Sequence, residues 1–91
     1  GTSPFDARSA VPRAMSEAEL AAVPAAFAAA ARRADAAGFD WIEIHAAHGY
    51  LLHSFCSPVS NHRPDRYGGP FENRVRLARE TARAVRAAWP D

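Results

Sequence analysis

The sequence lacks several features that mark special classes of protein. It has a single cysteine, Cys56, so no disulfide can form within the chain, which is compatible with a reducing compartment. The formal net charge of +1 is too small to indicate a nucleic acid or an anionic membrane as a partner. No apolar run approaches the roughly 18 residues of a membrane span, and no signal-peptide pattern opens the chain. We therefore expect a cytoplasmic protein with no nucleic-acid or membrane partner.

The composition is that of a globular protein, with 48% hydrophobic and 23% charged residues. The 91 residues fall well short of the ~250 residues of a typical (β/α)8 barrel. The chain has no starting methionine, and only one strand is apparent in it. Because a single strand cannot form a sheet, we interpret the chain as a segment of a larger α/β domain.

The apolar pattern predicts a helix–strand–loop–helix unit. The expected segments are a loop at 1–15, a helix at 16–37, a strand at 39–47, a long loop at 48–69 and a second helix at 70–89. A short helical turn is expected within the long loop, directly after the strand.

The first helix has clear start and stop signals. Ser16 and Glu19 form a capping-box pattern, and Gly38 is suited to the C-terminal cap. Pro24 lies about two turns inside, where it predicts a kink; the alternative is that the helix begins only at Pro24. The expected buried stripe is Leu20, Val23, Phe27, Ala30/Ala31 and Ala34.

The second helix is expected to begin at Pro70, with Gly69 as its cap. Its arginines lie mostly off the apolar stripe, which indicates a solvated face. The stripe expected to face the sheet is Phe71, Val75, Ala78, Ala82, Val85 and Trp89.

The strand alternates between two faces. Ile42 and Ile44 should pack against the helices, whereas Trp41, Glu43 and His45 should point the other way. In alternating α/β folds, catalytic residues collect where the chain leaves the carboxyl end of a strand. His45 lies near the end of the expected strand, and His48 and Tyr50 follow it.

His45, His48 and Tyr50 are the candidate site residues. Two imidazoles can donate hydrogen bonds to one substrate oxygen, bind a metal, or be satisfied by backbone groups. A phenol can donate a proton to a carbon that becomes carbanionic. A zinc site would need a third ligand, and no suitably spaced set of Cys, His or Asp supplies one, so no metal is expected.

Two long motifs resemble the old yellow enzyme family of FMN-dependent ene-reductases and NAD(P)H dehydrogenases on TIM (β/α)8 barrels. They are HAAHGYLLH at 45–53 and SPVSNHRPDRYGGPFENR at 57–74, within a likeness that runs from Pro4 to Pro90. The resemblance implies a piece running from about the third to the fourth helix of the barrel. Histidine at both positions 45 and 48 is similar to the bacterial xenobiotic reductase and NADPH dehydrogenase branch.

By this resemblance, His45 and His48 bind the oxygen of an activated alkene or a phenolic ligand above the flavin, and Tyr50 protonates the substrate carbon. The implied cofactor is FMN, with NADPH or NADH as reductant, and the FMN-binding groups are expected mostly outside this segment. The segment alone is therefore expected to be inactive, and a homo-oligomer of the intact protein is compatible with the resemblance. The rival hypotheses are an inactive truncated product and a TIM-barrel metal hydrolase that uses His45, His48 and Glu43.

The family signature is also matched by Arg63, Asp65 and Arg74. We expect these residues to stabilise the loop and not to take part in the chemistry. A polar loop over a barrel mouth needs internal ion pairs, and Asp65 is expected to pair with Arg63 or Arg74. Pro70 and Trp41 depart from the family pattern, since Pro70 replaces a serine cap and Trp41 replaces a small barrel-facing residue.

Overall fold

The computed structural model describes residues 8–90, which are helical with connecting segments. No helix in that range combines the length and apolar character that a membrane span requires. In chain order, the helices are α1 (Glu17–Ala36), α2 (Leu51–Cys56), α3 (Phe71–Arg74) and α4 (Arg76–Ala88).

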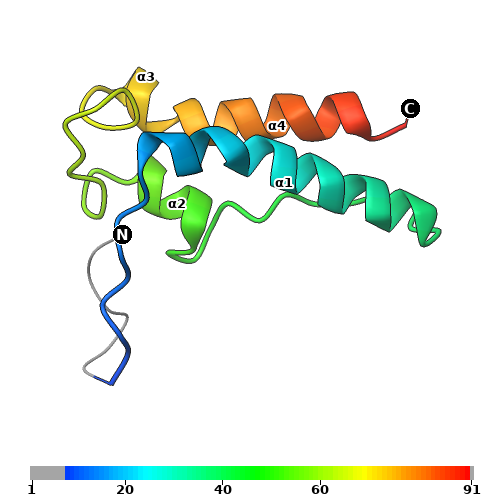
Figure 1. Ribbon diagram of the computed structural model, residues 1–91, viewed down its shortest axis with the longest axis horizontal. Helices are drawn as coiled ribbons and strands as arrows, with labels where there is room; N and C mark the ends of the chain where they lie inside the picture. Colours follow the sequence, from blue (N-terminus) through cyan, green and yellow to red (C-terminus); the bar gives the residue numbers. More distant parts are fainter. Residues whose placement is uncertain (1–7, 91) are drawn as a thin grey trace.

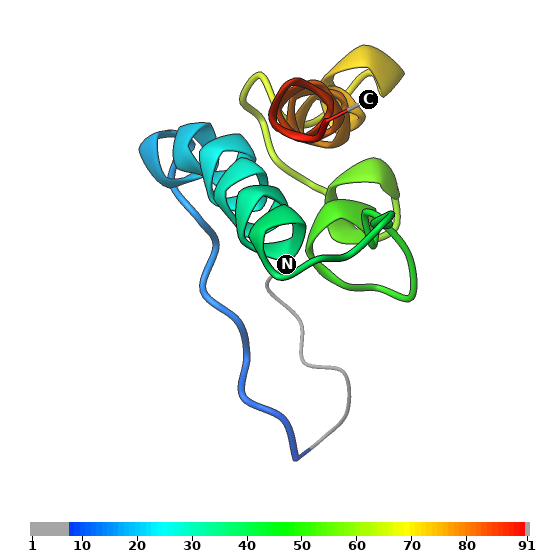
Figure 2. The same ribbon diagram turned by 90° about the vertical axis from the view of Figure 1, so that its right-hand side faces the viewer.

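The two long helices, α1 and α4, pack side by side and run in the same direction (Figure 1). Residues 37–50 run back from the end of α1 towards α2, so the chain reverses direction between the helices. Viewed along the helices, α1, α2 and α4 surround a common centre (Figure 2).

That centre is the hydrophobic core. It receives side chains from all three helices and from the loop before α3, and each fully buried large side chain stabilises the fold by about 1.5–3 kcal/mol. The core residues are Leu20, Val23, Leu52, Phe55, Tyr67 and Leu77, with Met15, Phe27 and Ile44 packed at the edge.

The N-terminus of α1 has the expected capping box. The Glu19 amide donates to Ser16 Oγ and the Ser16 amide donates to Glu19 Oε1, each at 3.1 Å. Arg13 adds two hydrogen bonds to the Glu19 carboxylate, at 2.9 and 2.7 Å. The hydrogen bonds from Arg13 and then from Ser16 lower the pKa of Glu19 to about 2, so this carboxylate is charged at neutral pH.

The C-terminus of α1 closes on Gly38, as predicted. The Gly38 amide donates to the Asp35 carbonyl at 3.0 Å, and the Phe39 amide donates to the Ala34 carbonyl at 3.1 Å. This pair of bonds is a Schellman motif, and it needs the positive φ of 92° that Gly38 adopts.

Pro24 lies inside an unbroken α1. The alternative in which the helix begins at Pro24 is therefore wrong. The buried side chains Leu20 and Val23 precede the proline, and Ala28 and Ala31 follow it. Burial of one stripe on both sides of Pro24 offsets the hydrogen bond that the proline removes.

The strand expected at 39–47 is not formed: residues 8–90 contain no strand. A strand is defined by ladder bonds to a neighbour, and this part of the chain supplies no second extended segment to pair with it. The predicted alternation is nevertheless present, because Ile42 and Ile44 are half-buried whereas Trp41, Glu43 and His45 are exposed.

The helix expected at 70–89 is divided into α3 and α4 at Val75, whose ψ of −3° departs from the helical value. Side chains of α3 donate hydrogen bonds to the loop before it, whereas α4 packs against α1. The two helices are therefore oriented by different parts of the protein. Pro70 is the cap rather than the first helical residue, and Gly69 precedes it.

The stripe that α4 buries also differs from the predicted one. Its buried residues are Leu77, Thr81 and Val85, of which only Val85 was predicted. Phe71 is 63% exposed, and Ala82 is exposed. The difference arises because α4 packs against α1 in this chain, whereas the prediction assumed a sheet beneath it.

Candidate functional site

His45, His48 and Tyr50 lie together at the end of the extended segment. The ring centroid of His45 is 5.3 Å from that of His48 and 5.4 Å from that of Tyr50. All three side chains are exposed, Tyr50 by 57%. The three predicted site residues therefore form one exposed cluster.

A tight turn at residues 47–50 brings this cluster together. His48 and Gly49 both have positive φ, 58° and 76°, and the Tyr50 amide donates to the Ala47 carbonyl at 3.2 Å. These φ values are those of a type I′ turn. The turn reverses the chain between His45 and Tyr50, so residues five positions apart bring their rings into proximity.

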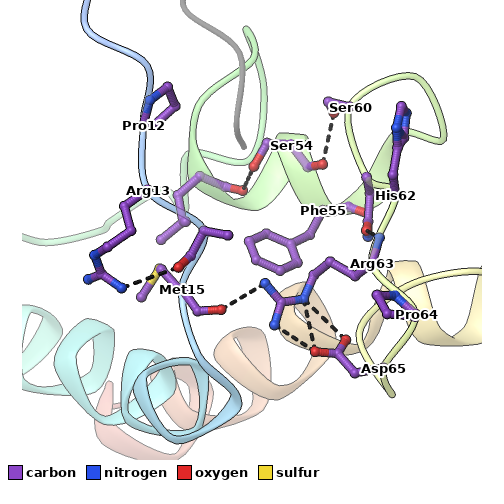
Figure 3. A pocket seen from close by; sticks show the side chains of 13 residues that line it. Pro12, Arg13, Met15, Ser54, Phe55, Ser60, His62, Arg63, Pro64 and Asp65 are labelled. Atoms are coloured by element: carbon purple, nitrogen blue, oxygen red, sulfur yellow. Dashed lines mark hydrogen bonds and ion pairs between the residues drawn. The ribbon is translucent and has the colours of Figure 1, made fainter.

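The loop that follows α2 is held by an ion pair. Arg63 donates to both oxygens of Asp65, with a shortest distance of 2.6 Å, and also to the Met15 carbonyl at 2.8 Å (Figure 3). The guanidinium holds the pKa of Asp65 below its ordinary value. Of the two partners predicted for Asp65, the structure shows Arg63, which also links the loop to the start of α1.

Asn61 is the buried centre of the same loop. Its side-chain amide donates to the carbonyls of Phe55 and Tyr67, at 2.6 and 2.8 Å, and its oxygen accepts from the Arg63 amide at 3.1 Å. Asn61 therefore ties the end of α2 to the far side of the loop. No sequence pattern indicates this role.

Arg74 satisfies backbone groups instead of pairing with Asp65. Its Nε donates to the Cys56 carbonyl at 3.1 Å and its Nη1 to the Gly69 carbonyl at 2.7 Å. These bonds connect α3 to the end of α2. The structural interpretation of this arginine therefore agrees with its contacts.

Gly68 permits the close approach of two parts of the loop. A Cβ atom there would lie 2.2 Å from the Arg63 carbonyl oxygen and 2.7 Å from Arg63 Cβ. The clash can be relieved only if the Arg63 backbone moves. We therefore expect Gly68→Ala to destabilise the intact protein by about 1–3 kcal/mol, as overpacking does. Urea unfolding of the two proteins measures the difference.

Gly38→Ala is the matched control for Gly68→Ala. Gly38 has a φ of 92° but no atom within 4 Å of the added Cβ, so this variant adds backbone strain without a clash. We expect it to cost roughly 1 kcal/mol. A loss of stability in Gly68→Ala no greater than that in Gly38→Ala would contradict the role of the close approach.

A pocket of about 590 Å³ lies between the start of α1, α2 and the loop that follows α2 (Figure 3). It is enclosed by residues 12–15, by α2 and by residues 60–65. His45, His48 and Tyr50 do not line it. No sequence pattern indicates this pocket, because its walls come from segments about 50 residues apart.

Metal ligands do not gather around the histidine pair. Within residues 8–90, no group of three His, Cys, Asp or Glu side chains is placed to hold a metal ion. Glu43, the third ligand of the metal-hydrolase hypothesis, is therefore not assembled with His45 and His48 in this part of the chain.

Comparison with known proteins gives consistent matches. The family model described as NADH:flavin oxidoreductase / NADH oxidase family matches residues 3–90. The NADPH dehydrogenase of Clostridium acetobutylicum is 52% identical over 86 residues, and that of Bacillus subtilis is 54% identical over 85. These matches cover 94% and 93% of this chain, but the chain spans only 25% of each relative.

Solved structures agree with the sequence matches. A morphinone reductase in complex with tetrahydroNAD superposes with a TM-score of 0.86 at 38% identity, covering 89% of this chain and 22% of that one. The old yellow enzyme homologue of Zymomonas mobilis gives a TM-score of 0.85 at 42% identity, covering 88% and 22%. The fold is thus that of a segment of an old yellow enzyme-type barrel; its exact position within the barrel stays a prediction. The chain belongs to the NADH:flavin oxidoreductase / NADH oxidase family.

Proposed function

We propose that the intact protein is an FMN-dependent NAD(P)H oxidoreductase that reduces activated alkenes such as enones. The observation that carries the proposal is the exposed cluster of His45, His48 and Tyr50, in which the His45 ring lies 5.3 Å from the His48 ring and 5.4 Å from the Tyr50 ring. Family membership and the NADPH dehydrogenase relatives support the redox chemistry.

His45 and His48 hold the activating oxygen of the substrate. Negative charge develops on this oxygen when the alkene accepts a hydride, and donors that are already in place stabilise it without reorganising. The exposed imidazoles of His45, just before the 47–50 turn, and of His48, within it, provide such a pair of donors. The same pair suits a phenolic ligand, whose oxygen also accepts hydrogen bonds.

Tyr50 supplies the proton. A hydride added to one carbon of an activated alkene leaves negative charge towards the other carbon, and a positioned acid lowers the barrier for this step. Tyr50 lies next to His45 and carries the phenolic hydroxyl of the cluster. Tyr50 thus protonates the substrate carbon while the histidine pair binds the substrate oxygen.

The cluster fits the substrate side of a flavin site. Imidazole and phenol groups are suited to a carbonyl oxygen and a reacting carbon, and the groups that hold the FMN phosphate are assigned to other strands by the resemblance. When bound in the intact protein, FMN would accept a hydride from NAD(P)H and pass it to the alkene. The chain described here contributes the groups that bind and protonate the substrate.

The reaction of the intact protein tests this proposal. We expect NADPH oxidation to accelerate with 2-cyclohexen-1-one but not with the saturated ketone cyclohexanone, because only the enone can accept a hydride at carbon. The acceleration should survive treatment with a metal chelator. Equal rates with both ketones would contradict the proposal, and a purified protein that holds a metal ion and lacks flavin absorbance would favour the metal-hydrolase class.

A further inference from the structure

His53 contacts the turn that carries the candidate site. The Gly49 amide donates to His53 Nδ1 at 2.8 Å. Gly49 is the second central residue of the turn, between His48 and Tyr50. The bond therefore joins the backbone of the turn to a side chain on α2.

This contact supports a backbone conformation that is unfavourable without help. His48 adopts a φ of 58°, a left-handed conformation that side-chain-bearing residues rarely adopt. Within the turn, the Tyr50 amide donates a hydrogen bond to the Ala47 carbonyl. The bond to His53 adds a second constraint, at the peptide that follows His48.

The His53 side chain is exposed, but the helix that carries it is packed into the core. His53 lies in the middle of α2, between Leu52, which is 1% exposed, and Phe55, which is 5% exposed. Both of these side chains belong to the hydrophobic core. The Gly49–His53 hydrogen bond therefore connects the turn to a helix that is packed into the core.

We propose that His53 is a positioning residue: by accepting the Gly49 hydrogen bond, it fixes the 47–50 turn and so sets His48 relative to Tyr50. The role in substrate binding rests on the function proposed above. It requires an unprotonated Nδ1, since a nitrogen that bears a proton cannot accept. His53 therefore carries its proton on Nε2 when it holds the turn.

Two substitutions in the intact protein separate the acceptor from the bulk of the side chain. His53→Ala removes the acceptor, whereas His53→Asn places an amide oxygen close to the position of Nδ1. A net hydrogen bond of ordinary strength corresponds to about a two- to tenfold change. We expect His53→Ala to speed hydrogen exchange in a peptide covering 47–50 and to weaken phenol binding by that factor, and His53→Asn to restore both.

His62→Ala is the matched control. Like His53, His62 is exposed and has a ring nitrogen close to a backbone group, in its case the Val59 carbonyl oxygen at 2.9 Å, but it lies in a loop outside the turn. The His62→Ala variant should leave hydrogen exchange of the 47–50 peptide and phenol binding unchanged. The proposal is overturned if His53→Ala leaves either measurement at the wild-type value, or if His53→Asn behaves like His53→Ala.

The two readouts also distinguish this proposal from the proposed function. If the wild-type protein neither binds phenol nor reduces an enone, the proposed function fails. Hydrogen exchange alone then decides whether His53 holds the turn: faster exchange in His53→Ala supports the link, and unchanged exchange removes it.

Discussion

Replacing Tyr50 by phenylalanine in the intact protein is expected to slow oxidation of the reduced flavin by an enone by about 10²–10⁴-fold, the usual contribution of a positioned acid. Reduction of the flavin by NADPH should keep its wild-type rate, because that step puts no proton on a substrate carbon. Stopped-flow absorbance of the two half-reactions, recorded separately, measures both rates.

The reductive half-reaction is the internal control for this variant. If the Tyr50 phenol only packed in the turn, its loss would disturb the cluster as a whole, and both half-reactions would fall together or neither would. Equal slowing of the two would remove Tyr50 from the proton-transfer step.

Replacing His45 and His48 together by alanine is expected to weaken phenol binding by about 100-fold, or ~3 kcal/mol, the typical cost of losing a donor at an oxyanion site. FMN should stay bound, since neither histidine is assigned to its phosphate. Titration calorimetry with phenol and the flavin absorbance of the purified variant give the two quantities.

His62→Ala serves as the control for the double variant, because it removes an imidazole from the neighbouring loop without touching the cluster. Its phenol affinity should equal that of the wild type. Wild-type affinity in the double variant, or a comparable loss in His62→Ala, would contradict the assignment of the oxygen-binding pair.

The sequence predicted the features that are determined by residues close together in the chain. The capping box at Ser16 and Glu19 and the Gly38 termination of α1 depend on residues within one turn, so the sequence alone predicts them. The alternating exposure of residues 41–45 was predicted for the same reason. The family resemblance, which rests on two long motifs, is confirmed by the comparisons.

Features that depend on partners distant in sequence were missed. The strand at 39–47 needs neighbours that residues 8–90 do not supply, and the burial of Leu77 depends on α4 packing against α1. The role of Asn61 was missed because a buried amide in a loop looks in sequence like any other turn residue.

The candidate site residues could be proposed from the sequence, but their geometry could not be predicted. Spacing and resemblance singled out His45, His48 and Tyr50, and the structure brings them together. The positive φ of His48 and the contact from His53 carry no pattern that a sequence displays, because most turn signals involve Gly, Asn or Asp.

The most direct test of the central claim is a crystal structure of the intact protein with phenol bound. We predict that the phenol oxygen lies within hydrogen-bond distance, about 2.7–3.2 Å, of ring nitrogens of both His45 and His48. We also predict that the Tyr50 hydroxyl faces the phenol ring. A phenol oxygen bound elsewhere in the active site, with both histidines occupied by backbone groups, would contradict the account.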